Sequence, residues 1–265
     1  MMIDIHSHIL MNVDDGAQSE SDSLEMARQA VKEGITTIVA TPHHKLRSYH
    51  NPKQKVLTGV ARLNALLQKE QIPLTVLPGQ EVRIDGDLLE DFRKGELLTV
   101  NDKGMYLLIE FSSSHIPAYA PRLFYELQLA GYIPVIVHPE RNTVFLEQPD
   151  RLYEFVNHGA LTQVTEGSIV GCFGKKIQKF SHQLIQANLT HFIASDAHNT
   201  TTRSFKLVEA YETIRTHYDD DIVGLLQHNA ELLVQGESIL TEIPEKIQKP
   251  SFLSFFKNKS IFMKS

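Results

Sequence analysis

The sequence predicts a single α/β domain built around a parallel sheet. Short apolar runs rich in Ile, Val and Leu alternate with longer amphipathic stretches, which is the pattern expected of successive βα units. The chain has 265 residues, of which 42% are hydrophobic and 22% charged, so its composition is that of an ordinary globular protein. An α/β barrel of this length commonly forms one domain.

Each predicted strand is a short apolar run. The amphipathic stretches between the runs predict helices, and several have end signals, such as Ser21 or Asp22 before an apolar helical pattern and Gly34 or Gly131 after one. The predicted strands are residues 2–5, 35–41, 74–77, 105–111, 133–138, 160–165 and 191–195. The predicted helices are residues 21–33, 53–70, 86–94, 120–130, 150–157, 174–187, 205–216 and 222–233.

The composition changes near the end of the chain. Residues 246–265 contain five lysines and no acidic residue, and phenylalanines are interleaved with the lysines. We therefore expect residues 1–245 to form the folded domain and residues 246–265 to be an appended basic tail. Such a tail can contact an anionic membrane surface or a partner groove, and a disordered terminus is an equally good interpretation.

Net charge and cysteine content narrow the classes of partner and the location. A net charge of -6 and a pI near 6.1 argue against a surface that binds polyanions, so no nucleic acid partner is expected. The single cysteine, Cys172, cannot form an internal disulfide, and the segment MMIDIHSHIL has no basic region leading into an apolar one. Without an apolar run of about 18 residues, the expected location is the cytoplasm.

Residues that can bind metals follow almost every predicted strand. The carboxyl ends of the strands form the active site of an α/β barrel, so these side chains are expected to meet. In His6-Ser7-His8, an i, i+2 pair on an extended chain directs both rings to one side, where they can share an ion. A single pair of histidines with this spacing also occurs on ordinary protein surfaces. What indicates a metal site is that candidate ligands follow several strands at once. The residues are Asp4, His6, His8, His43, His44, Glu81, Glu110, His138, Asp196 and His198.

The candidate ligands are imidazoles and carboxylates, with no thiolate among them. This mixture favours manganese, iron, zinc or cobalt over calcium and over a structural zinc site built from cysteines. The candidates are too many for one ion, so we expect several. Closely spaced ions can share a hydroxide and can hold the attacking and leaving oxygens of a phosphoryl transfer.

Two arginines follow the metal-binding clusters. Arg141 ends the segment V-H-P-E-R, and Arg203 comes shortly after S-D-A-H-N. The planar guanidinium group matches two phosphate oxygens and keeps its charge at any working pH. A single arginine in a loop is most often simply exposed to solvent. Two arginines that each follow a cluster of metal ligands favour a site that binds an anion.

Two other phosphate chemistries are not supported by the sequence. A cysteine phosphatase would need an arginine six positions after its thiolate, and Gln178 stands at that position after Cys172. The segment from Gly171 to Lys176 lacks the spacing and the hydroxyl of a nucleotide-binding phosphate loop. Neither mechanism is therefore expected.

The ordered motifs M-I-D-I-H-S-H, D-D-G, T-P-H-H, P-G-Q-E, L-I-E-F, V-H-P-E-R and S-D-A-H-N resemble those of the polymerase and histidinol phosphatase (PHP) family. The resemblance extends from residue 2 to about residue 233. Within the family it is strongest to the bacterial manganese-dependent tyrosine-protein phosphatases that accompany capsule and exopolysaccharide tyrosine kinases. It implies a distorted, TIM-like barrel of about seven βα units that holds up to three ions, with manganese expected first.

The resemblance also implies a role for each matching residue. Arg141 and Arg203 match catalytic positions that contact the phosphate of the substrate. Asp14 is adjacent to Asp15, and His44 to His43, so the choice within each pair stays open. The implied ligands are His6, His8, Glu81 and Asp196 for one ion, Glu81, Glu110 and His138 for a second, and Asp15, His43 and His198 for a third.

The implied reaction is hydrolysis of phosphotyrosine on proteins by a metal-bound hydroxide, with a bacterial tyrosine kinase as the expected partner. A PHP phosphatase for a small phosphomonoester such as histidinol phosphate is an alternative, because the same metal shell would serve it. A metal-dependent amidohydrolase is a weaker one, since that family often has a lysine at the fourth strand, where Glu110 stands here. A catalytically silent, metal-stabilised interaction module is the alternative of another class.

Overall fold

All the strands of the fold run in parallel. The computed structural model describes residues 2–46 and 49–248, and every ladder between its named strands is parallel. Apart from two strands that continue directly into a short further strand, each strand is therefore followed by a connection that returns the chain to the same end of the sheet. The strands are β1 Met2–Ser7, β2 Ile35–Ala40, β3 His43–His44, β4 Thr75–Pro78, β5 Glu81–Arg83, β6 Tyr106–Glu110, β7 Ile133–Val137, β8 Leu161–Thr165 and β9 Phe192–Ala194.

Two of the predicted strands are each followed, after two residues, by a short further strand that the sequence does not predict. One sheet has the order β1-β2-β4, and the other has the order β3-β5-β6-β7-β8-β9. β3 follows β2 after residues 41–42, and β5 follows β4 after residues 79–80. Pro42 has no N–H group to donate, so it interrupts the ladder. Beyond the breaks, His43 pairs with Glu81, and Glu81 pairs with Leu108.

The junction between β9 and β1 is short. Ser7 and Ala197 form an isolated parallel bridge, the N–H of Asp196 donates to the carbonyl of His6 at 2.8 Å, and the N–H of His8 donates to the carbonyl of Ala197 at 2.8 Å. The strands thus follow one another in sequence order, with the two breaks and this junction as the distortions. This is the predicted α/β architecture of parallel strands in a single domain.

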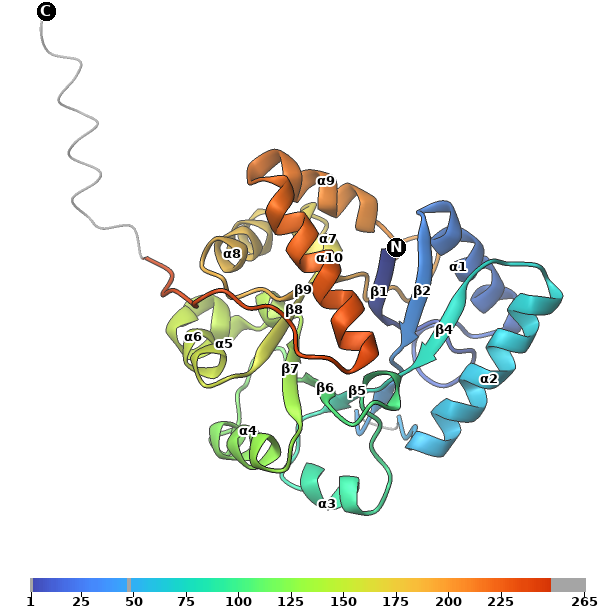
Figure 1. Ribbon diagram of the computed structural model, residues 1–265, viewed down its shortest axis with the longest axis horizontal. Helices are drawn as coiled ribbons and strands as arrows, with labels where there is room; N and C mark the ends of the chain where they lie inside the picture. Colours follow the sequence, from blue (N-terminus) through green and yellow to red (C-terminus); the bar gives the residue numbers. More distant parts are fainter. Residues whose placement is uncertain (1, 47–48, 249–265) are drawn as a thin grey trace, which may run out of the picture.

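Helices surround the sheets (Figure 1). The predicted start signal of the first helix is wrong by two residues: Ser21 and Asp22 lie within α1, and the side chain of Ser19 caps it by accepting a hydrogen bond from the N–H of Asp22. The predicted end signals are confirmed, because Gly34 and Gly131 follow α1 and α4 with φ values of +82° and +90°. The helices are α1 Glu20–Lys32, α2 Lys53–Lys69, α3 Leu88–Arg93, α4 Ala120–Leu129, α5 Thr143–Glu147, α6 Pro149–Asn157, α7 Glu166–Ile169, α8 Lys175–Gln186, α9 Leu207–His217 and α10 Asp220–Gln235, with 3-10 turns η1 Val100–Asp102 and η2 Pro139–Arg141.

Two layers of buried side chains hold the fold together. The larger one lies between the helices and the strands. The inner one consists of alternate strand residues, such as Ile3 and Ile5 of β1, as expected when one face of each strand points inward. α10, which crosses the middle of Figure 1, adds Leu233 to the inner layer. It packs at the amino ends of the strands, where the hydroxyl of Tyr106 donates to the carbonyl of Glu237 at 2.6 Å.

The sequence pattern misses the shortest helical segments. It predicts neither of the 3-10 turns, nor α5, nor α7, because such segments are too short for a helical period of apolar residues to show. α5 rests on a local cap instead: the side-chain oxygen of Asn142 accepts hydrogen bonds from the N–H groups of Val144 and Phe145. η2 and α5 follow β7, and α7 follows β8, so these three belong to the end of the fold where polar side chains gather, whereas η1 precedes β6.

Residues 236–248, which follow α10, have no regular secondary structure but are attached to the domain. The N–H of Ile239 donates to the hydroxyl of Tyr106 at 3.2 Å, the N–H of Glu245 donates to the carbonyl of Ala187 at 2.8 Å, and Ile247 packs against the core. From residue 249 on, the predicted tail lies outside the described residues, so its boundary and its contacts stay predictions. Within residues 2–46 and 49–248, none of the helices combines the length and apolar character needed to cross a membrane.

Candidate metal centre

The carboxyl ends of the strands bring the predicted ligands into one cluster. The connections between strands position each of them after or near a strand end, which is where α/β barrels place their active sites. Most are buried, and the side chain of Asp15 is the exposed exception at 49%. The cluster contains His6 of β1 and His8 after it, Asp15 before α1, His43 of β3, Glu81 of β5, Glu110 of β6, His138 after β7, and Asp196 and His198 after β9.

His6 and His8 are each oriented by a hydrogen bond to the nitrogen that faces away from the cluster. Nδ1 of His6 lies 2.8 Å from Oε1 of Gln163, and Nδ1 of His8 lies 2.7 Å from Oδ2 of Asp14. These oxygens accept hydrogen bonds, so each Nδ1 carries the proton and donates it. The lone pair of each ring is consequently on Nε2, which is the arrangement that metal-binding histidines require.

The two Nε2 atoms face two carboxylates at a spacing that suits one metal ion. They lie 3.3 Å from each other, and each lies 3.3 to 3.5 Å from Oε2 of Glu81 and from Oδ1 of Asp196. An ion bound about 2.1 Å from four tetrahedral donors separates those donors by about 3.4 Å. Among the donors here, His6, His8 and Glu81 offer ligand atoms within 4.8 Å of one another, and Asp196 adds a fourth donor beside the two rings. These four residues are the set that the motifs imply for the first ion.

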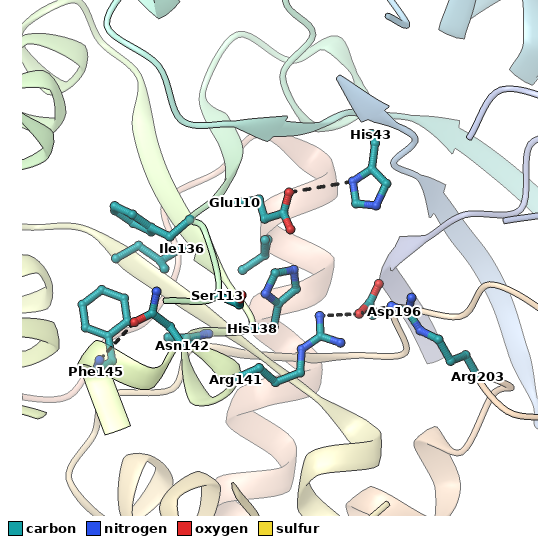
Figure 2. A pocket seen from close by; sticks show the side chains of 13 residues that line it. His43, Glu110, Ser113, Ile136, His138, Arg141, Asn142, Phe145, Asp196 and Arg203 are labelled. Atoms are coloured by element: carbon teal, nitrogen blue, oxygen red, sulfur yellow. Dashed lines mark hydrogen bonds and ion pairs between the residues drawn. The ribbon is translucent and has the colours of Figure 1, made fainter. Parts of the chain in front are cut away.

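A second group surrounds Glu81. Nε2 of His138 lies 2.7 Å from Oε1 of Glu81, while Nδ1 of His43 lies 2.8 Å from the other oxygen of that carboxylate. Nδ1 of His43 also lies 3.9 Å from Oε2 of Glu110 (Figure 2). Glu81 thus lies between the first and second groups, as expected of a bridging carboxylate. His43 contacts the second group as well as the third, to which the motifs assign it.

A third group lies around Asp15. Its Oδ1 atom is 3.4 Å from Nε2 of His43 and 3.6 Å from Nε2 of His198, and His8 completes the group. Several buried atoms of the second and third groups have no hydrogen-bond partner within the described residues. They are Nδ1 of His43, Oε2 of Glu81, Oε2 of Glu110 and Nε2 of His198; the first two lie 2.8 Å apart, but not in the geometry of a hydrogen bond. Buried polar atoms of this kind are normally satisfied, so they fit a site completed by cations.

The structure separates the two aspartates of D-D-G. Oδ2 of Asp14 is used by Nδ1 of His8 and by the N–H of His43, and its Oδ1 accepts from the N–H of Gly16. Asp15 makes no such backbone contacts and reaches the third group, so its carboxylate is the better candidate ligand. Gly16 is required here, because a Cβ at this position would lie 2.0 Å from the carbonyl oxygen of His8.

Two residues singled out at strand ends have other surroundings. Asp4 accepts hydrogen bonds from the N–H and the hydroxyl of Ser195, which ties β1 to β9. His44 accepts a hydrogen bond at Nδ1 from the N–H of Asn51 at 3.2 Å. Neither belongs to the three groups. Sequence reasoning also missed Gln163, whose only signal is an amide among apolar residues within a predicted strand.

The carboxylates of the cluster repel one another. Burial opposes the charge of Glu81, but His43 and His6 outweigh it and hold the pKa of Glu81 well below its usual value. Burial and the charge of Glu81 together raise the pKa of the neighbouring Glu110 to about 7. Crowded carboxylates of this kind are stabilised by cations, which is the electrostatic condition for a metal site.

The pKa values of the histidines in the cluster are shifted in both directions. Burial lowers the pKa of His138 to about 4, helped by the charge of Arg141, and burial beside His8 lowers that of His198 to about 4. Both rings are then neutral near pH 7, which is the form that binds metals. Burial also disfavours the charge of His8, but Asp14 outweighs it and raises the pKa of His8 well above its usual value.

Backbone strain occurs at two of the candidate ligands. His138 has φ and ψ of 37° and 50°, and Asp196 has a φ of 52°. A residue other than glycine in this left-handed region costs about 1 to 2 kcal/mol. Such strain persists where the surroundings impose it, and it is concentrated at functional sites. His138 directly follows β7, Asp196 comes two residues after the end of β9, and both turn their side chains into the cluster.

The two predicted arginines meet at one carboxylate. Arg141 and Arg203 each donate from a terminal nitrogen to Oδ2 of Asp196, at 2.6 and 2.7 Å, and they approach it from two sides (Figure 2). Both border a cavity of about 290 Å³ that is also lined by Glu110 and His138. An anion in this cavity would therefore lie between two fixed positive charges and the ligand cluster.

Comparisons with known proteins agree with this geometry. The profile of the family described as "Capsular polysaccharide synthesis, CpsB/CapC" matches residues 2–235. The tyrosine-protein phosphatase YwqE of Bacillus subtilis is 49% identical over 255 residues, which are 96% of this chain and 100% of the relative. The putative tyrosine-protein phosphatase CapC of Staphylococcus aureus is 42% identical over 249 residues, which are 94% of this chain and 97% of the relative.

Solved structures agree as well. A chain from "Crystal structures of YwqE from Bacillus subtilis and CpsB from Streptococcus pneumoniae, unique metal-dependent tyrosine phosphatases" matches with a TM-score of 0.91 and 50% identity, covering 94% of this chain and 100% of that one. A probable 2-pyrone-4,6-dicarboxylic acid hydrolase from Acinetobacter baumannii matches with a TM-score of 0.51 at 15% identity, covering 88% and 99%, so it shares the fold alone.

The fold and the site together define an α/β protein that gathers histidines and carboxylates at the carboxyl ends of barrel-like parallel strands. Because the family profile and the relatives extend over nearly the whole chain, this protein belongs to the CpsB/CapC family of capsular polysaccharide synthesis. The resemblance that the sequence motifs indicate is confirmed.

Proposed function

We propose that this protein is a metal-dependent protein-tyrosine phosphatase of capsule or exopolysaccharide synthesis. The observation that carries the proposal is the convergence at Asp196, where one carboxylate oxygen faces Nε2 of His6 and His8 and the other accepts from Arg141 and Arg203. A metal-binding cluster and an anion-binding pair thus share one residue. The relatives named as tyrosine-protein phosphatases, at 49% and 42% identity, support the same activity for this chain.

The chain provides the groups that bind and orient a phosphate ester. Bound metal ions would supply Lewis acidity, which activates water as a nucleophile and offsets the charge of the phosphate. Asp14 and Gln163 fix the rings of His8 and His6 so that their Nε2 atoms face the ions. Arg141 and Arg203 would hold phosphate oxygens through guanidinium N–H groups and stabilise the charge that is redistributed during transfer.

The proposed ligands are the nine residues of the three groups, and the proposed metal is manganese, with up to three ions. Nitrogen and carboxylate donors without thiolates support manganese, and they would also accept iron, zinc or cobalt. We further propose that the substrates include a bacterial tyrosine kinase and that the enzyme acts in the cytoplasm. The relatives' names give tyrosine-protein phosphatase activity, and the family description gives capsular polysaccharide synthesis. Together they support phosphotyrosine proteins of capsule synthesis as substrates.

A metal exchange experiment with two substrates tests the proposal. Chelation should abolish hydrolysis of a phosphotyrosine peptide, and manganese should restore it. Full activity in protein that contains no transition metal by elemental analysis would refute metal dependence. Faster turnover of histidinol phosphate than of the peptide would favour the small-molecule alternative, and no turnover of either above buffer would favour the silent interaction module.

A further inference from the structure

The loop between α7 and α8 is a tight turn that displays one aromatic side chain. The N–H of Cys172 donates to the carbonyl of Gly167 at 2.8 Å, and the N–H of Gly174 donates to the carbonyl of Gly171 at 3.0 Å. Gly171 and Gly174 have φ values of +88° and +90°, which favour glycine over other residues. The backbone on both sides of Phe173 is therefore fixed by the turn.

Phe173 lies beside the arginines of the proposed site. Its side chain is 38% exposed, although phenylalanine is usually buried. The guanidinium carbon of Arg141 lies 5.4 Å from the centre of the ring, which is within the range of a cation–π contact. The ring also lines a small cavity together with Asp196 and Arg203. An exposed apolar ring thus borders both groups that are proposed to hold the phosphate.

We propose that Phe173 is a specificity residue that packs against the aromatic ring of the substrate, an inference that rests on the proposed phosphatase function. A single ester oxygen separates the phosphorus from the ring in an aryl phosphate. When Arg141 and Arg203 hold the phosphate, the ring of the substrate comes within reach of Phe173, which does not line the larger cavity but contacts Arg141 and lies beside Arg203. Two aromatic rings attract in offset or edge-to-face arrangements. An aliphatic phosphate has no ring and gains nothing from this contact.

Binding of two non-hydrolysable phosphonates tests the inference separately from turnover. Phenylphosphonate and methylphosphonate share the anionic group, and only the first has a ring. Calorimetry on the manganese-loaded protein should show that Phe173→Ala weakens phenylphosphonate binding by about three- to tenfold, the range of an aromatic pair. Methylphosphonate binding should change less than about twofold. Phe173→Tyr should restore the preference, and Tyr125→Ala, a change of an exposed aromatic residue on α4, should leave it unchanged.

The turnover of a phosphotyrosine peptide by the same variants adds a second readout. For Phe173→Ala, kcat/KM should fall by the same factor, mainly through a higher KM. Equal weakening of both phosphonates, no weakening of either, or failure of Phe173→Tyr to restore the preference would overturn the inference. A ring-dependent preference in protein that does not hydrolyse the peptide would refute the proposed function and support the aromatic contact. Hydrolysis of the peptide without a ring-dependent preference would support the proposed function and refute the aromatic contact.

Discussion

Asp14 and His8 form a hydrogen bond of 2.7 Å between Oδ2 and Nδ1, whereas the next residue, Asp15, faces His43 and His198. Two adjacent carboxylates therefore have different surroundings. Asp14 is shared between a ring and two backbone N–H groups, and it orients His8. This difference makes Asp15 the proposed direct ligand of an ion.

This difference predicts different effects of matched substitutions. Asp15→Asn should lower the number of bound metal ions, because it weakens a direct ligand. Asp14→Asn should keep the stoichiometry at saturating metal but weaken metal affinity or activity by about 10- to 100-fold, as is typical when the partner of a metal-binding histidine is changed. Elemental analysis and metal titration on the same preparations separate the two effects. The opposite pattern would make Asp14 the ligand.

The close approach of Gly16 to His8 predicts a strong effect of one methyl group. Gly16→Ala should lower both thermal stability and metal content, because the new Cβ would lie 2.0 Å from the carbonyl oxygen of His8. Gly224→Ala is the matched control in α10: its Cβ meets nothing within 4 Å, and the change should stabilise the helix by about 0.5 to 1 kcal/mol. Unfolding curves and metal analysis measure both. An unaltered Gly16→Ala protein would contradict the packing described for D-D-G.

Arg141 is expected to act on the phosphate while the metals stay bound. Arg141→Ala should lower the rate by about 10²- to 10³-fold, the typical cost of losing one preorganised donor. Arg141→Lys should recover little, because an ammonium group lacks the paired N–H geometry of a guanidinium. His138→Ala should reduce bound metal as well. The comparison requires kcat/KM and metal stoichiometry together, and loss of activity only through loss of metal would contradict the role of Arg141.

The fold and the composition of the cluster could be predicted from the sequence because both follow from local patterns. Apolar runs mark the strands, and His6, Glu110 and Asp196 stand where those runs end. The sequence could not show that a further short strand beyond Pro42 would place His43 opposite Glu81, because register depends on how neighbouring strands pair. Contacts between residues that are far apart in the sequence could not be predicted either.

Residues that act through a distant partner illustrate this limit. Gln163 lies in the middle of a predicted strand, and its value as the partner of His6 depends on a contact across 157 positions of sequence. The choice between Asp14 and Asp15 likewise depended on which side chain the turn at Gly16 directs to His8. Phe173 was set aside with a segment that fails as a phosphate loop, and only its contact with Arg141 indicates a role.

A buried histidine away from the site predicts how stability depends on pH. The ring of His191 accepts a hydrogen bond from the N–H of Thr162 at 3.1 Å, and burial lowers the pKa of His191 from 6.5 to about 4. Below pH 6.5 the unfolded chain binds a proton here that the folded chain does not bind until about pH 4. The neutral ring of His191 therefore contributes fully to the free energy of unfolding above pH 6.5. This contribution, about 3 kcal/mol in total, is lost as the pH falls toward 4.

The variant His191→Asn keeps an acceptor near the position of Nδ1 but cannot titrate. Between about pH 7 and about pH 4.5, the free energy of unfolding should decrease in both proteins. The decrease should be about 2 kcal/mol smaller in the variant than in the unmodified protein. Urea unfolding in the presence of a chelator measures this, since release of metal then affects neither protein. The same loss in both proteins would show that His191 does not contribute to acid sensitivity.

Two truncations distinguish the packed segment after α10 from the predicted tail. Residues 237–248 are tied to the amino ends of the strands through the hydroxyl of Tyr106, which contacts the carbonyl of Glu237 and the N–H of Ile239. Deleting residues 237–265 should therefore lower the melting temperature by about 5 to 10 °C, as expected for a loss of a few kcal/mol in a domain of this size. Deleting residues 250–265 should leave the melting temperature and the hydrolysis of a chromogenic phosphate ester nearly unchanged. A large loss of hydrolysis in the shorter deletion would mean that those residues belong to the catalytic domain.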